Sequence, residues 1–349
     1  MSDVIGNRLT DNALAADDAA DLVARARREI EDAYGWKPSD PDAVFTGYYY
    51  DPRKIGSRIV RVADAAGKTA VLKLQLRPLR FDEGFIIRQV APQIRTPRVR
   101  LPRILRDEPW SEARGYGFLL FEDLTALPDL WHARRPDGAD LARHRDFLAA
   151  FARGALPIAA WFPPPSDGAR EQALAAFAHF RAIADASPHR RLSAGETSRL
   201  RDAWIARLPP NAAPPHFTHG HLSGLDVKVD AASDAYVLFA NLTWSYRPPF
   251  YEVVFPWWAD AMGIRDPRVT ADDLRRRADA WADIGAAAFG RDPRADPAFR
   301  FALLTRAALT VLLDLGASDW PPEEADARGA LWQAWKDFFR QETGSGLGR

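Results

Sequence analysis

One stretch of the chain, from His216 to Glu252, constrains the fold more than any other, because it places polar side chains on both sides of a short hairpin pattern. Apolar runs at 227–229 and 236–240 flank the polar turn at 231–234, and this arrangement predicts two antiparallel strands. The polar residues that flank the predicted hairpin are His219, His221, Asp226 and Asn241.

Composition limits what such a hairpin can belong to. A chain of 349 residues is long enough for two lobes with separate cores. The 47 basic residues balance the 47 acidic ones, so nucleic acid is not expected as a partner. The absence of cysteine excludes disulfides and thiolate metal sites. No run of 18 apolar residues and no leader-like N-terminus is present, so we expect a cytoplasmic protein that does not cross a membrane.

The first third of the chain has the pattern of an antiparallel sheet with two helices. Residues 12–30 carry acids early and bases late, which is typical of a helix. Aromatic and β-branched runs then predict strands at 44–50, 58–63 and 69–75. A helix is expected at 82–90, and a buried strand at 116–124 stops at Glu122 and Asp123.

The remainder is mainly helical. Apolar residues recur at helical spacing in six segments, several of which open with Asp, Ser, Thr or Pro. We therefore predict an N-terminal lobe at 1–125 and a helical C-terminal lobe at 126–349, which carries the segment 216–245. The six predicted helices are 140–161, 169–186, 193–208, 270–289, 297–315 and 321–339.

The run His219-Gly-His-Leu-Ser-Gly-Leu-Asp226, followed by a strand that ends in Asn241-Leu-Thr-Trp, resembles a motif of the aminoglycoside phosphotransferase and choline kinase family. That motif is His-Gly-Asp-Leu-His-x-x-Asn, followed by a strand ending in Ile-Asp-Trp-Glu. The resemblance implies an α+β, bilobal, protein-kinase-like fold with a small antiparallel sheet lobe and a larger helical lobe. This chain departs from the motif at four places: His221 replaces the first Asp, Ser223 the second His, Asp226 the Asn and Asn241 the Asp of the second strand.

The resemblance extends to the small lobe. Lys73 occupies the place of the family's ATP-phosphate lysine, although a lysine in a half-buried strand is by itself typical of a solvent-facing surface. Glu83, ten residues later, is the natural partner for it. The segment 118–124 resembles the strand and hinge against which adenine lies, so Glu122 and Leu124 are candidate nucleotide contacts.

The substitutions bear directly on the implied chemistry. Phosphoryl transfer needs a group that accepts the proton of the acceptor hydroxyl, and hard oxygen ligands for Mg²⁺. The resemblance implies ATP and Mg²⁺ as cofactors, with Asp226 and Asn241 facing the metal and His221 at the position of the base. An imidazole with a pKa of about 6.5 can accept a proton near neutral pH. Loss of a well-placed base costs about 10²- to 10⁴-fold in rate.

Three functional hypotheses follow. The first is a pseudokinase or strongly impaired phosphotransferase that serves as a binding module. The second is an active ATP-dependent small-molecule phosphotransferase in which His221 is the base and Asp226 holds magnesium. The third is a kinase-fold enzyme that performs other chemistry with His221 as acid or base. In each case a small molecule is expected in the interlobe cleft, and the sequence identifies neither that molecule nor the oligomeric state.

Two further groups of residues have alternative interpretations. His216, His219 and His221 lie within six residues and could bind zinc, but no fourth ligand is evident and a structural role for His219 fits the resemblance better. Three tryptophans follow the hairpin, and they either wall an apolar ligand pocket or fill the core: Trp244, Trp257 and Trp258.

Overall fold

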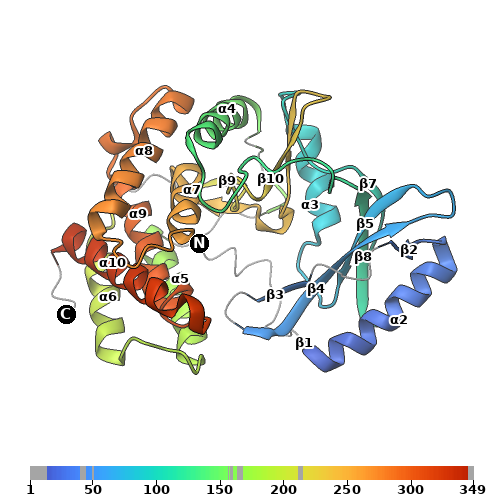
Figure 1. The fold of residues 1–349 in the computed structure, drawn as a ribbon, viewed down its shortest axis with the longest axis horizontal. Coiled ribbons are helices and arrows are strands. Elements are labelled where there is room, and N and C mark those ends of the chain that lie inside the picture. The colour runs from blue at the N-terminus through green and yellow to red at the C-terminus, as the bar shows by residue number, and fades with distance from the viewer. Residues whose placement is uncertain are drawn as a thin grey trace.

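The computed structural model consists of a sheet lobe and a helical lobe that lie side by side, on the right and left of Figure 1. Their arrangement confirms the predicted α+β, bilobal architecture. The structure describes residues 14–39, 45–48, 51–155, 157, 160–162, 168–210 and 215–344.

The sheet lobe is built on one antiparallel sheet of order β1-β4-β5-β8-β7, in which β2 and β3 also pair with β4. Side chains alternate across it with a period of two. Leu72 and Leu74 pack in one apolar cluster with helix α2 (Ala16–Tyr34), whereas Val71 packs in the other with helix α3 (Glu83–Val90). The strands are β1 (Leu14–Ala15), β2 (Lys37–Pro38), β3 (Phe45–Tyr48), β4 (Asp51–Ala63), β5 (Thr69–Gln75), β7 (Ile104–Ser111) and β8 (Tyr116–Glu122).

Among the described residues, the helical lobe contains a helix in each of the six predicted segments and one more, α7. Capping boxes start three of them, because Asp137, Ser193 and Thr270 each accept a backbone N–H at the third helical residue. The helices are α4 (Gly138–Gly154), α5 (Ala169–Asp185), α6 (Ala194–Ile205), α7 (Tyr251–Met262), α8 (Ala271–Phe289), α9 (Pro297–Leu309) and α10 (Ala325–Thr343), and a π-helical turn, η4 (Thr310–Asp314), extends α9.

Two elements differ from the sequence-based expectation. Helix α7 is buried along most of its length and contains Pro256 near its middle, so it has neither an amphipathic pattern nor a continuous run of good helix formers. The passage before β8, which is rich in proline, nevertheless contains β6 (Val99–Arg100) and β7. Helix α7 and these two strands therefore lack a sequence pattern that would predict them.

The predicted hairpin is present, and it is held between the two lobes. Strands β10 (Val227–Asp230) and β11 (Ala235–Leu238) pair antiparallel, and β6 joins β11 in parallel. A second small ladder pairs β9 (His216–Thr218) with β12 (Ser245–Arg247). Both ends of the segment 216–247 are therefore tied together, and in Figure 1 the strands β9 and β10 lie between α7 and α3.

Candidate functional site

His219 is a structural residue of the loop between β9 and β10. Its Nε2 donates to the carbonyl oxygen of Phe239 at 2.6 Å, and its Nδ1 accepts from the backbone N–H of His221 at 3.2 Å. These partners require a neutral ring with the proton on Nε2. Complete burial lowers the pKa of His219 to about 3, so the ring stays neutral. His219 thus fixes the loop against the end of β11.

His221, Ser223 and Asp226 form one polar cluster. The Nδ1 of His221 lies 3.0 Å from Oδ2 of Asp226, and the hydroxyl of Ser223 donates to the same oxygen. Burial acts to raise the pKa of Asp226, but His221 and Ser223 outweigh it, and the pKa lies below its ordinary value. Asp226 is therefore a carboxylate at neutral pH, and the most favourable tautomer of His221 carries its proton on Nδ1.

The outer part of His221 remains accessible. Its ring packs on Phe255 of α7, with the centroids 4.4 Å apart, while 43% of the side chain is exposed. Because Asp226 occupies Nδ1, Nε2 is the nitrogen that carries a lone pair. The cluster can thus accept a proton from a bound hydroxyl group.

Lys73 and Glu83 come together as an ion pair, with Nζ and Oε2 2.5 Å apart. The other carboxylate oxygen of Glu83 accepts from the backbone N–H of Asn241 at 3.0 Å. Glu83 therefore connects strand β5 of the sheet lobe with the turn η2 (Asn241–Thr243), which follows the hairpin. These contacts join Lys73 and Glu83 to the backbone of Asn241, whereas His221 and Asp226 pair with each other; that all five residues line one site remains a prediction.

The side chain of Asn241 is turned inward. Its Nδ2 donates to the carbonyl oxygen of Leu238 at 3.0 Å, and its Oδ1 accepts from Nε1 of Trp244 at 3.1 Å. The residue is only 1% exposed. The preceding residue, Ala240, has a φ of +53°, an unfavourable value for a residue with a side chain, and so directs the chain into this turn.

The residues present do not fit a two-ligand magnesium site in this arrangement. The amide oxygen of Asn241 is buried against Trp244, and one oxygen of Asp226 already accepts two hydrogen bonds. Magnesium demands near-octahedral oxygen coordination, usually with one or two carboxylates. Within the described ranges, no group of three or more His, Asp or Glu side chains is placed to hold a metal ion. The metal-binding roles of Asp226 and Asn241 remain predictions.

The hinge residues are committed to contacts within the protein. Oε1 of Glu122 accepts from Arg100 at 2.5 Å and from the backbone N–H of Arg103 at 2.8 Å. Arg100 also donates to Asp230 of β10, and thereby ties the end of β8 to the hairpin. Leu124 is buried, and its carbonyl oxygen accepts from Leu127. The carboxylate of Glu122 therefore faces arginine, and the nucleotide contacts of Glu122 and Leu124 remain predictions.

The three neighbouring histidines do not converge. Nε2 of His216 lies 2.6 Å from Oε1 of the buried Glu252, whereas His219 and His221 bind Phe239 and Asp226. Burial acts to lower the pKa of His216, but the charge and hydrogen bond of Glu252 outweigh it and raise the pKa. Glu252 thereby anchors β9 to the first turn of α7.

The tryptophans have different environments. Trp244 and Trp257 are fully buried, and belong to the core of the helical lobe. Trp258 is partly exposed, and the guanidinium of Arg306 lies 3.7 Å above its ring. Of the three, only Trp258 can contribute to a ligand surface.

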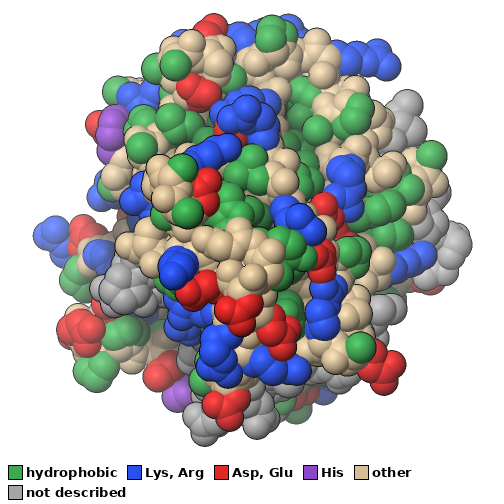
Figure 2. Space-filling model, turned by 90° about the vertical axis from the view of Figure 1, so that its right-hand side faces the viewer, with side chains coloured by type: hydrophobic (Ala, Val, Ile, Leu, Met, Phe, Trp, Pro, Cys, Tyr) green, Lys and Arg blue, Asp and Glu red, His purple; other side chains and the backbone are tan. Residues whose placement is uncertain are grey.

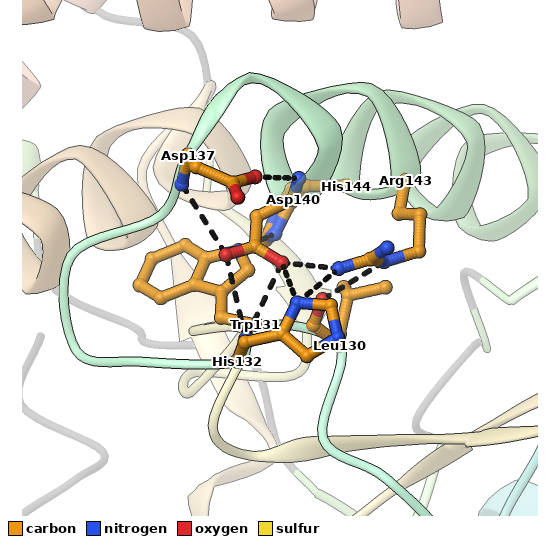
Figure 3. A network of polar contacts seen from close by, with 7 residues as sticks. All are labelled: Leu130, Trp131, His132, Asp137, Asp140, Arg143 and His144. Carbon is orange, nitrogen blue, oxygen red and sulfur yellow. Dashed lines mark hydrogen bonds and ion pairs between the residues drawn. The ribbon is translucent and has the colours of Figure 1, made fainter.

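Trp131 is a residue of this region that sequence reasoning missed. Its backbone N–H donates to the carbonyl oxygen of Gly224 at 3.1 Å, and its indole lies so close that a Cβ at Gly224 would be 2.0 Å from Cδ1 of Trp131. Nε1 of Trp131 donates to Nδ1 of the buried His144 at 3.0 Å (Figure 3). Gly224 in the loop was the sole sequence indication of such a close approach.

The N-terminus of α4 holds Trp131 in place. Asp140 accepts from the backbone N–H groups of His132 and Asp137 and from the guanidinium of Arg143 (Figure 3). Asp140 is 1% exposed, so these donors balance a buried carboxylate. The segment 130–132 is consequently fixed at both of its ends, by α4 and by the loop between β9 and β10.

The fold is protein-kinase-like, as in aminoglycoside phosphotransferases. Its features are the two lobes, the Lys73–Glu83 pair and the hairpin of β10 and β11. Three solved structures illustrate this likeness. A thermostable mutant of the aminoglycoside phosphotransferase APH(4)-Ia, in its apo form, has a TM-score of 0.60 at 14% identity, over 91% of this chain and 99% of that chain. A putative aminoglycoside phosphotransferase from Ralstonia eutropha has a TM-score of 0.56 at 9% identity, over 93% and 98%.

The amicoumacin kinase hAmiN, in complex with AMP-PNP, Ca²⁺ and Ami, has a TM-score of 0.53 at 12% identity, over 90% of this chain and 95% of that chain. No family model matches the sequence, and no curated protein matches it. Because the identities are low, the likeness establishes the fold. Among the described residues, no helix is long and apolar enough to traverse a bilayer.

Proposed function

We propose that this chain is a kinase-fold protein that binds a nucleotide between its lobes and transfers phosphate at a strongly impaired rate or not at all. Lys73, on strand β5 of the sheet lobe, would bind the nucleotide phosphates. Its ammonium group is held in position by Glu83 of helix α3. The backbone of the segment 122–124 is the edge against which the base would lie. Magnesium is not required for this binding.

One observation carries the proposal: both side chains expected to face a metal are engaged elsewhere. Asp226 accepts from His221 and Ser223, and Asn241 is buried between Leu238 and Trp244. Freeing Asn241 would leave the indole N–H of Trp244 without its acceptor, which costs about 1–3 kcal/mol for a buried group. A metal would have to displace these contacts before it could bridge the phosphates.

A binding titration tests the proposal. Isothermal calorimetry with ATP and with ADP, each with and without magnesium, should give equal affinities in both conditions. Lys73→Ala should abolish binding, whereas Lys228→Ala should not. Lys228 is a suitable control because it also lies in a strand, is partly buried, and forms an ion pair, with Asp129 at 2.8 Å. Binding that requires magnesium and disappears in Asp226→Ala would refute the proposal.

The geometry of His221 favours a second candidate, an active small-molecule phosphotransferase. Asp226 holds Nδ1–H of His221, as the Asp of a catalytic triad holds its His, and directs the lone pair of Nε2 outward. In this mechanism the hydroxyl oxygen of the acceptor attacks the γ-phosphorus of ATP while Nε2 of His221 takes the hydroxyl proton. The bond to the bridging oxygen breaks, and ADP leaves. His221 would then be the catalytic base.

Turnover measurements distinguish the two candidates. If His221 is the base, His221→Ala abolishes ATP turnover with a hydroxylated acceptor, whereas His221→Asp preserves it. Asp226→Asn should also lower the rate, because the amide stabilises the wrong imidazole tautomer. The first candidate instead predicts, at most, a trace of acceptor-dependent turnover in the wild type and in each of these variants. Product formation that persists without ATP would indicate other chemistry at His221.

A further inference from the structure

A pocket on the helical lobe lies between α4, α7 and α8, outside the region of Lys73 and His221. Its volume is about 310 Å³, which is within the range of small-molecule sites. Three arginines line it, Arg135, Arg276 and Arg277, together with two aspartates. Apolar surface is contributed by Leu141 and Ala280, next to the buried Trp281. The pocket thus combines a basic rim with an apolar wall.

The aspartates leave much of the arginine surface free. Nη1 of Arg277 donates to Oδ1 of Asp260 at 2.6 Å, and Nη2 of Arg276 donates to Oδ1 of Asp273 at 2.5 Å. Each guanidinium has five N–H donors, so most donors of both arginines remain. Arg135 is exposed and makes no hydrogen bond or ion pair with any residue that the structure describes. Positive charge therefore exceeds negative charge in the pocket.

The base of the pocket is rigid. Asp260 is 3% exposed and accepts from Nε1 of Trp281 at 3.2 Å as well as from Arg277. The ring of Trp281 also packs against His144 and Trp131, whose ring centroids lie 4.7 Å and 5.8 Å from its own. The buried carboxylate of Asp260 therefore orients the guanidinium of Arg277 before any ligand binds. Such preorganisation favours binding, because the ligand need not order these groups.

We propose that this pocket binds a small organic oxyanion, a phosphate monoester or a carboxylate on a compact apolar body, through Arg135, Arg276 and Arg277. Planar guanidinium groups recognise both oxyanions by paired hydrogen bonds. The apolar part of the ligand lies against Leu141 and Ala280. The pocket is an accessory site, distinct from the proposed nucleotide site and independent of it.

The test is a calorimetric titration of the full chain with three probes of one shape: phenyl phosphate, benzoate and uncharged phenol. At least one of the two anions should bind, phenol should bind at least 10-fold more weakly, and added salt should weaken anion binding. The pair of anions shows which oxyanion the pocket prefers. Equal binding of phenol and the anions, or no binding of either anion at millimolar concentration, would overturn the proposal.

Two sets of variants locate the site. The double variant Arg135→Gln/Arg276→Gln changes exposed residues, so it should fold, and anion binding should weaken at least 10-fold. The matched control Arg145→Gln/Arg300→Gln removes the same charge from exposed positions outside the pocket and should bind normally. Lys73→Ala should bind the anions normally, even if it loses nucleotide. Anion binding that is lost in Lys73→Ala but kept in the double variant would refute the accessory site.

Discussion

Removing Glu83 should destabilise the junction of the lobes, because this one carboxylate serves both of them. It holds Lys73 at 2.5 Å through one oxygen and the backbone N–H of Asn241 at 3.0 Å through the other. The perturbation is Glu83→Ala, and the comparison is Glu83→Gln. The glutamine keeps an oxygen for Asn241 but loses the charge that pairs with Lys73.

The magnitude follows from burial. Glu83 is 9% exposed, so its removal leaves a mostly buried ammonium without its partner, a loss of about 3–5 kcal/mol. The orphaned N–H of Asn241 costs about 1–3 kcal/mol. Both losses arise from one carboxylate and are not additive, so we expect about 4 kcal/mol for Glu83→Ala. Glu83→Gln should cost about 2 kcal/mol, because only the charge is lost.

Urea unfolding followed by circular dichroism measures these free energies of unfolding. Glu31→Ala is the control, because Glu31 forms an exposed ion pair with Lys37 at 3.1 Å, and such pairs contribute about 1 kcal/mol or less. This expectation is refuted if Glu83→Ala costs no more than Glu31→Ala. It is also refuted if Glu83→Gln and Glu83→Ala cost the same, since Asn241 would then make no contribution.

Two further predictions concern stability. The pKa of His216 is raised and that of Glu252 lowered in the folded chain, so the histidine's stabilising contribution is complete below about pH 6.5 and is lost as the pH rises through its raised folded pKa. The advantage of wild type over His216→Gln in urea unfolding should therefore be larger at about pH 6 than at about pH 9; an advantage that grows with pH would contradict it. Gly224→Ala should destabilise the protein by about 1–3 kcal/mol, because the new Cβ would overlap Trp131. Gly329→Ala, in helix α10, should stabilise it by up to about 1 kcal/mol, because the atom nearest to the new Cβ would be 3.6 Å away. Equal melting temperatures for the two variants would be evidence against this packing.

On the surface of the sheet lobe, basic and acidic side chains lie next to one another (Figure 2), and several of them form ion pairs. The pairs Arg88 with Asp107 and Lys37 with Glu31 are examples, at 2.5 Å and 3.1 Å between nitrogen and oxygen. This mixture is the structural counterpart of the balanced composition. Exposed pairs of this kind contribute little to stability, so the fold depends on the buried groups discussed above.

Local patterns predicted most of the architecture. The strand at 69–75 and the helix at 82–90 agree with β5 and α3 because alternation and capping are encoded by neighbouring residues. Helix α7 escaped prediction because it is apolar on nearly every face and contains Pro256. Strand β6, only two residues long, exists through its pairing with β11, more than a hundred residues later in the chain.

The sequence by itself determined which chemical groups this protein can offer: a histidine and an aspartate in a loop beside a hairpin, and a lysine and a glutamate in a sheet and the helix after it. The tertiary structure alone decided how these groups are used. The pairing of Asp226 with His221, the burial of Asn241 against Trp244, and the packing of Trp131 on Gly224 depend on distances between segments that sequence spacing does not specify. The physical reason is that a side chain's hydrogen-bond partners follow from its position in the packed molecule, whereas its chemical identity is local.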